Sequence, residues 1–435
     1  MLSVSLGIQA ITPEALADSL NRNLGLQRTR WLSKVKVDRI ETRGRSVSVY
    51  TNRTLGGISF TPAGLDSLRQ QVGFWTLRDS SATVSIYSDN VEIGTLISSY
   101  HRPNGRRYSY QNRTPRTHIE GLAPLNLPGQ ELWTQGLHDR YIALWPSHGT
   151  YYNRKQELWR WQRATMWTTV EDLYTTEYTR QISRMLERAG AVVLQPRPRL
   201  EGRDLILRNG RWIYRETGEA YKQGRSGMMR WQEAAREWLE YAGFPDTIYD
   251  YFKGENDYKS DMICRGKWVN FLMGGSEAHP TADGLGIPVD LCLALHTDGL
   301  SEDDNRSIVG TLAIYYSKGD DKKTCFPNGV SRQINRDLAD YVQTQIVQDI
   351  RRLYCPEWTR RMLNDANYAE SRVPEVPTVL IELLSHKNMP DMIYGLILAS
   401  ASMPRVPCTK ASCVTCTPRT VRSPSYNPYP STTAA

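Results

Sequence analysis

Apolar and polar positions alternate along the first quarter of the chain in a way that predicts short strands between helices. The strand-like segments are residues 34–40, 46–50, 82–87 and 92–97, the last two forming a hairpin around Asp89-Asn90. Thr12-Pro13 and Thr61-Pro62 each open a helical segment, because threonine caps a helix and proline suits its first turn. We therefore expect residues 1–125 to form a small α+β domain.

The pattern changes after residue 140, where short apolar runs alternate with longer segments of helical period. Strands are expected at residues 141–145, 191–194, 289–295, 310–316 and 378–381, and long helices at 168–189 and 332–353. A strand, a helix and a second strand in this order indicate a parallel pair joined by a crossover helix. Residues 126–398 are therefore expected to form an α/β domain with a mostly parallel sheet flanked by helices.

Three stretches lie outside these regular patterns. Residues 103–129 are rich in Pro, Arg, Asn and Gly, which is typical of a linker or an extended arm. Residues 200–288 are less regular, with a hairpin predicted at Asn209-Gly210 and a helix at 231–241. Residues 399–435 are rich in Pro, Ser, Thr, Arg and Cys without any hydrophobic period, and we expect them to be disordered.

Composition narrows the class of protein only slightly. The 435 residues are 40% hydrophobic and 23% charged, as in ordinary globular proteins, and the net charge is +8. This charge suits a polyanionic partner such as nucleic acid or a cell-wall polymer, or is a scattered solvated excess. No segment is long and apolar enough to span a bilayer, and residues 1–16 lack the basic leader and apolar core of a signal peptide.

Four ionisable residues are expected to meet at one edge of the predicted sheet. His148, His296 and Glu382 each follow a predicted strand, and Glu171 opens the first crossover helix. Binding sites in open parallel sheets form at the carboxyl ends of the strands, so these side chains should converge. Taken singly, each has a structural explanation, such as a hydrogen-bonded strand end or a carboxylate attracted to a helix N-terminus.

Two imidazoles and one carboxylate form a common catalytic zinc shell that leaves a position for water. Bound zinc lowers the pKa of water to about 7 and polarises a substrate carbonyl. A further carboxylate must then accept the proton and pass it to the leaving nitrogen, a role that suits Glu382. Asp298, two residues beyond His296, is a candidate to orient a metal ligand.

Two weaker candidates concern the surroundings of such a site. Gly274, Gly275 and Ser276 follow Trp268 and Phe271 and would either line a substrate groove or form a plain loop. Ser147, which precedes His148, is a candidate for contact with a ligand or with substrate.

These segments resemble the zinc-dependent N-acetylmuramoyl-L-alanine amidase family of the amidase_3 type. The matching segments are Trp145-Pro146-Ser147-His148-Gly149, Val170-Glu171-Asp172-Leu173, Ala294-Leu295-His296-Thr297-Asp298 and residues 377–388 around Glu382. The resemblance covers roughly residues 140–197 and 289–398. It implies Zn²⁺ held by His148, Glu171 and His296, with Glu382 as catalytic carboxylate. It further implies a peptidoglycan substrate, no nucleic-acid partner, and a location outside the cytoplasm.

The chain departs from this family in ways that leave other functions open. Asp298 stands where the family usually has Asn, and residues 198–288 form an insertion between the two halves of the site. The insertion resembles a variant of amidase-like proteins from Bacteroidetes that are sometimes labelled xanthan lyases. A polysaccharide lyase and a non-catalytic protein that binds cell wall or glycan therefore remain alternatives to the amidase.

Overall fold

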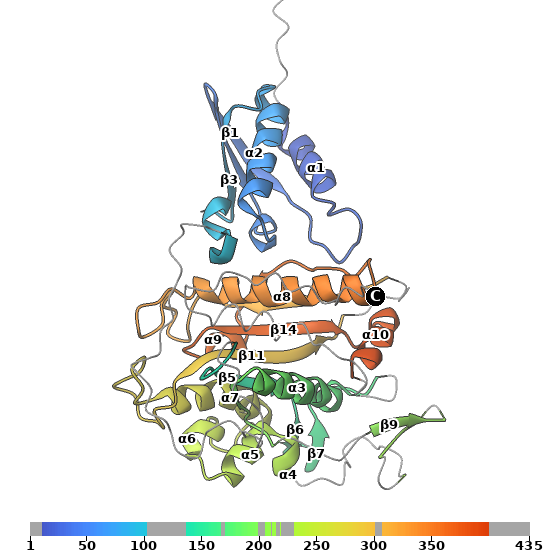
Figure 1. Ribbon diagram of the computed structural model, residues 1–435, viewed down its shortest axis with the longest axis vertical. Helices are drawn as coiled ribbons and strands as arrows, with labels where there is room; N and C mark the ends of the chain where they lie inside the picture. Colours follow the sequence, from blue (N-terminus) through green and yellow to red (C-terminus); the bar gives the residue numbers. More distant parts are fainter. Residues whose placement is uncertain are drawn as a thin grey trace, which may run out of the picture.

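A six-stranded sheet forms the centre of the protein, as seen in the computed structural model (Figure 1). The structure describes residues 11–101, 136–166, 170–198, 205–209, 211–214, 218, 230–300 and 307–399. The sheet has the order β13-β12-β14-β11-β5-β8. Its strands are β5 (Tyr141–Pro146), β8 (Val192–Leu194), β11 (Val289–Asp298), β12 (Leu312–Tyr315), β13 (Asn364–Asp365) and β14 (Thr378–Ser385). Every neighbouring pair is parallel except β12 with β14, so the predicted mostly parallel α/β sheet is confirmed.

Helices cover both faces of this sheet. They are α3 (Glu171–Arg188), α4 (Arg230–Glu233), α5 (Ala235–Tyr241), α6 (Asp246–Tyr249), α7 (Asp257–Met273), α8 (Gln333–Leu353), α9 (Ala369–Arg372) and α10 (Met389–Ala399). One face, which includes Leu293, packs against α3 and α8, while Ala294 and Leu380 on the other face pack against α5 and α7. Because side chains alternate along a strand, His296 and Glu382 share the α7 face with Ala294 and Leu380.

The amino-terminal residues form a separate layer beside α8 (Figure 1). Its elements are α1 (Pro13–Asn23), β1 (Val37–Arg43), β2 (Ser46–Thr51), α2 (Pro62–Leu77), β3 (Thr83–Ser88) and β4 (Val91–Glu92), with a sheet order β1-β2-β3-β4. Thr12 and Thr61 cap the two helices by accepting backbone N–H bonds, as their sequences predict. The layer has its own core of buried aliphatic side chains.

The predicted hairpin in this layer is only partly correct. β3 pairs with β4, but β4 ends at Glu92 and the chain turns into a 3₁₀ helix, Ile93–Leu96. The Thr95 hydroxyl donates to the Glu92 carbonyl at 2.6 Å, which closes the turn and ends the strand. The predicted linker and the boundary between residues 125 and 126 lie outside the described residues.

The amino-terminal layer meets the sheet domain through buried charged side chains of α8. The Arg336 guanidinium donates to three backbone carbonyls of the layer, those of Gly56 (2.9 Å), Ile58 (3.1 Å) and Leu96. Asp340, one helical turn further on, accepts hydrogen bonds from Ser98 and from Arg360 (2.7 Å). We call Arg336 and Asp340, with these partners, the α8 junction.

Two strands are longer than the sequence predicts, which changes the setting of two candidate residues. β11 continues to Asp298 and β14 to Ser385, because their ladder pairs His296 with Glu382 and Asp298 with Ser385. His296 and Glu382 therefore lie within paired strands rather than after strand ends. Their backbones are adjacent, and each side chain is held by a strand on either side.

The segment between β8 and β11 contains more helix than predicted. The helix expected at residues 231–241 is broken into α4 and α5 at Ala234, which has an extended backbone. The 17-residue helix α7 was not predicted, because it is buried on most of its circumference and so has no clear polar stripe. The predicted hairpin around Asn209 is confirmed as β9 (Leu205–Arg208) paired with β10 (Arg211–Tyr214).

Two further observations complete the architecture. A second hairpin, β6 (Thr150–Asn153) with β7 (Leu158–Trp161), follows β5 directly. Across the described ranges, no helix has the length and apolar character that crossing a membrane requires. The expected disorder of residues 399–435 falls outside the described residues, except for Ala399 at the end of α10.

Gly310, which precedes β12, is required by both its backbone conformation and its surroundings. Its φ is +77°, and an added Cβ would collide with the Thr359 carbonyl oxygen. Gly310→Ala should lower the free energy of unfolding by about 2–3 kcal/mol, since left-handed strain and overpacking add together. Gly329→Ala is a matched control, because Gly329 has φ +80° with open space around it. Urea unfolding should show a clearly larger loss at Gly310, and equal losses would contradict this account.

Candidate metal centre

Three of the four predicted residues lie together in a buried cluster. His148, Glu171 and His296 each offer a ligand atom, and these atoms lie within 4.8 Å of one another. His296 Nδ1 is 3.3 Å from Glu171 Oε1, and the two imidazole ring centroids are 4.8 Å apart. All three side chains are almost inaccessible to solvent. A buried group of two imidazoles and one carboxylate has the donor types of a zinc site.

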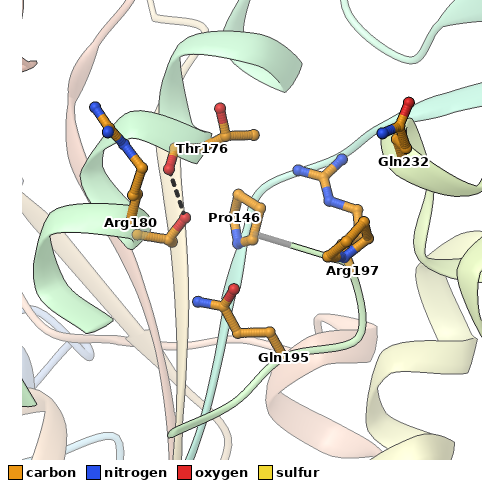
Figure 2. Close-up of a pocket in the computed structure, with 8 residues that line it drawn as sticks. Pro146, Thr176, Arg180, Gln195, Arg197 and Gln232 are labelled. Atoms are coloured by element: carbon orange, nitrogen blue, oxygen red, sulfur yellow. Dashed lines mark hydrogen bonds between the residues drawn. The ribbon is translucent and has the colours of Figure 1, made fainter. Parts of the chain in front are cut away.

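His148 is positioned by its backbone, which leaves its imidazole available. The residue follows β5 by one position beyond Ser147, and its carbonyl accepts a hydrogen bond from Arg197 at 2.7 Å. Arg197 also donates to the Glu233 carbonyl at 2.8 Å and lies beside Pro146 and Gln195 in a small pocket (Figure 2). This buried arginine therefore ties the turn after β5 to α4.

Glu171 begins α3, and its carboxylate is surrounded by donors. Oε1 accepts the Thr297 backbone N–H at 3.1 Å, while Oε2 lies 3.7 Å from Arg163 Nε and 3.8 Å from His386 Nδ1. Burial acts to raise the pKa of Glu171, but the hydrogen bond with His296 and the nearby positive charges outweigh it and leave the pKa lowered. The carboxylate is thus held in the ionised form that a metal ligand requires.

His296 lies between two carboxylates, one on each ring nitrogen. Nδ1 faces Glu171, and Nε2 lies 2.5 Å from Oε2 of Glu370. The Nε2 contact is a close charge pair that is poorly aligned for a linear hydrogen bond. Burial acts to lower the pKa of His296, yet the charge of Glu370 and the bond with Glu171 raise it to about 10.

Glu370, in the short helix α9, was not predicted from the sequence. Its Oε1 accepts a hydrogen bond from Trp145 Nε1 at 2.8 Å and another from Arg265 of α7. Burial opposes its ionisation, but His296 and Arg265 lower the pKa of Glu370 to about 2. No residue spacing marks this position, because its partners come from β5, α7 and β11.

Glu382 lies beside His296 on the neighbouring strand β14 and points to the same face of the sheet. Its Oε2 is buried and has no hydrogen-bond partner among the described residues. Burial raises the pKa of Glu382 to about 8, against the opposing effect of His296. The carboxyl group is therefore able to hold or release a proton near neutral pH.

The residues present fit a metal ion on one further observation. His148 Nδ1 is buried without a hydrogen-bond partner in the described part of the chain. Burial and the charge of His296 lower the pKa of His148, so its imidazole is neutral. A neutral, unpartnered ring nitrogen next to an ionised carboxylate is the state in which histidine binds a divalent metal.

The remaining predicted residues lie around or away from this cluster. The Ser147 hydroxyl bonds to that of Thr175 at 2.9 Å, and Asp298 pairs with Arg361 at 2.6 Å rather than with a candidate ligand. Gly274, Gly275 and Ser276 form the turn after α7. Because the neighbouring Ile287 leads into the start of β11, the structure places this turn at the opposite end of that strand from His296.

Comparison with known proteins gives no family assignment. No family model matches the chain, and no curated protein matches it. Solved structures with similarity to it are cell-wall amidases with low scores. Ami1 from Mycobacterium smegmatis is 11% identical and covers 65% of this chain and 95% of its own, with a TM-score of 0.34. The CwlV catalytic domain from Bacillus (Paenibacillus) polymyxa var. colistinus is 9% identical and covers 63% and 94%, with a TM-score of 0.30. CwlD from Clostridioides difficile, solved with the GerS lipoprotein, is 11% identical and covers 64% and 96%, with a TM-score of 0.29. Likeness at this level assigns no function to the chain.

Proposed function

We propose that this protein is a zinc-dependent amidase that hydrolyses an amide bond in peptidoglycan. The observation that carries the proposal is the buried cluster of His148, Glu171 and His296 beside the unpartnered carboxyl group of Glu382. His148, Glu171 and His296 would hold the metal, and Glu382 would serve as general base and then general acid. The four residues come from separate parts of the chain, so sequence proximity does not explain their meeting.

Each side chain has a distinct task in this reaction. A bound zinc ion would supply a Lewis acid that polarises the amide carbonyl and activates water. Glu382 Oε2 takes the proton from the attacking water and delivers it to the leaving nitrogen. Thr297 and Arg163 keep Glu171 oriented through contacts with its two oxygens. Burial of the cluster strengthens each of these electrostatic effects.

The substrate class rests on the family resemblance of the motifs around these residues. That family cuts the bond between the lactyl group of peptidoglycan and L-alanine. The motifs before His148, at Glu171, at His296 and around Glu382 occur in the family's order. A substrate of this kind places the protein outside the cytoplasm, and the net charge of +8 suits an anionic cell-wall polymer.

Metal binding and peptide release together test this proposal. The metal-stripped protein should bind one zinc ion in calorimetry, and the loaded protein should release stem peptides from purified sacculi. A chelator should abolish release, and His148→Ala should abolish stoichiometric zinc binding because one of three ligands is lost. His138→Ala is a matched control, since His138 is part-exposed and pairs with Asp139 outside the cluster.

The outcomes separate the proposal from its alternatives. Zinc binding without peptide release would overturn the substrate assignment. Unsaturated product absorbance from a uronate-containing polysaccharide would indicate a lyase instead. Retention on sacculi without cleavage by the zinc-loaded protein would indicate a binding protein. Failure of the wild-type protein to bind zinc would overturn the proposal as a whole.

A further inference from the structure

The two ring nitrogens of His296 have different partners, and this distinguishes their tasks. Nδ1 faces Glu171, which belongs to the candidate ligand cluster. Nε2 faces Glu370, which is not part of that cluster within the described residues. If His296 binds a metal through the nitrogen that faces the other ligands, that nitrogen is Nδ1. Nε2 is then left to make the ring's second contact.

Glu370 is itself held by two donors that fix the orientation of its carboxylate. Trp145 Nε1 and Arg265 both donate to Oε1, so Oε2 is the oxygen left for His296. Glu370 and Arg265 are buried, and Trp145 is fully so. An oriented carboxylate on the outer nitrogen of a metal-binding histidine fixes both the ring and its tautomer.

We propose that Glu370 is a positioning residue for the metal centre, which accepts the Nε2 proton of His296 and so keeps Nδ1 free to bind the metal. This inference rests on the proposed zinc site, and it adds a residue outside the predicted ligand set. The proton stays on Nε2, and Nδ1 gives up its own proton when the metal binds. Glu370 touches neither substrate nor metal.

The inserted segment takes part in this arrangement through Arg265. Arg265 lies in α7, within residues 198–288, and pairs with Asp261 at 2.5 Å as well as with Glu370. Asp261 in turn accepts hydrogen bonds from Gln162 at 2.6 Å and from the Arg236 backbone at 3.0 Å. The insertion therefore reaches His296 through a chain of buried charges. We infer that it is part of the metal centre's framework rather than an appended domain.

Glu370→Gln tests the inference because it keeps the shape and changes only the hydrogen bonding. Trp145 and Arg265 would hold the amide oxygen, so the amide NH₂ would face His296 Nε2. Nε2 would then have to accept, which puts the proton on Nδ1 and blocks metal binding. We expect zinc affinity, measured by competition with a chromophoric chelator, to fall by roughly 10–100-fold. The same tautomer change should appear in the ¹⁵N spectrum of histidine-labelled protein.

Glu375→Gln is the matched control for this experiment. Glu375 lies 3.2 Å from His279 Nδ1, so it is also a carboxylate against a histidine, but outside the cluster. Its zinc affinity should match that of the wild type. Thermal unfolding of the metal-free proteins separates a folding defect from a metal-site defect. Arg265→Lys is a second variant, since one ammonium group replaces a guanidinium that serves two carboxylates, and it should weaken zinc binding several-fold.

The possible results assign failure to the right hypothesis. A wild-type protein that binds zinc, together with a Glu370→Gln variant within twofold of it, would overturn the role of Glu370 and leave the proposed function intact. A wild-type protein that binds no zinc would overturn both. Weaker zinc binding by Glu370→Gln and Glu375→Gln alike would show a general loss of structure and would also contradict the inference.

Discussion

Glu382→Gln should reduce peptide release from sacculi by roughly 10²–10⁴-fold while zinc affinity changes by less than about threefold. The glutamine keeps the size of the side chain but cannot accept and return a proton. Glu382 is also not in the candidate ligand cluster, so its replacement leaves the metal's donors in place. The measurement is kcat for stem-peptide release, with zinc content determined on the same preparation.

A contrast between two carboxylates makes this result interpretable. Glu240→Gln removes a carboxylate at an exposed position on α5 and should leave kcat unchanged. Equal activity of Glu382→Gln and wild type would show that Glu382 carries no proton in the reaction. Loss of activity together with loss of zinc would place Glu382 among the groups that hold the metal, and its role would need revision.

Arg336→Met should lower the free energy of unfolding by about 3–5 kcal/mol, the largest stability effect that we expect in this chain. The substitution removes a buried guanidinium that donates to the carbonyls of Gly56, Ile58 and Leu96. Methionine fills much of the volume but leaves these three acceptors without a donor. It also leaves Asp340 with one fewer positive neighbour.

Urea unfolding and limited proteolysis measure this effect together. The amino-terminal layer should become sensitive to protease before the sheet domain does, since the α8 junction is its main polar attachment. Arg352→Met is the control, because Arg352 lies on the same helix but pairs with Asp349 at an exposed position. A loss below about 1 kcal/mol for Arg336→Met would show that the junction contributes little.

Much of the sheet domain follows from local patterns in the sequence. The apolar runs that form β5 and β11 are flanked by polar turns, and the period of α3 is clear in its buried leucine and isoleucine residues. Parallel order then follows from chain topology, and this brings His148, Glu171 and His296 to one place. Their meeting could be predicted because each is fixed by an element that has its own signal.

The contacts of Glu370 and Arg336 could not be predicted in the same way. Each depends on which elements pack together in three dimensions, and neither residue lies in a motif. α7 was missed because its buried charges, Asp261 and Arg265, hide its apolar faces from a periodicity analysis. Polar side chains in the interior are chosen by their partners, and partners distant in sequence leave no local pattern.

The order of the strands also determines when the metal centre can exist. β5 and β11 are neighbours in the sheet, yet about 140 residues separate His148 from His296, and β14 comes later still. The cluster cannot assemble from any short stretch of nascent chain, and its contacts have a high sequence separation, which slows folding. Zinc would therefore be taken up only after the parallel ladder has closed. A chain released from the ribosome before β14 emerges would lack Glu382 and the strand that supports His296, so metal capture would report completed synthesis.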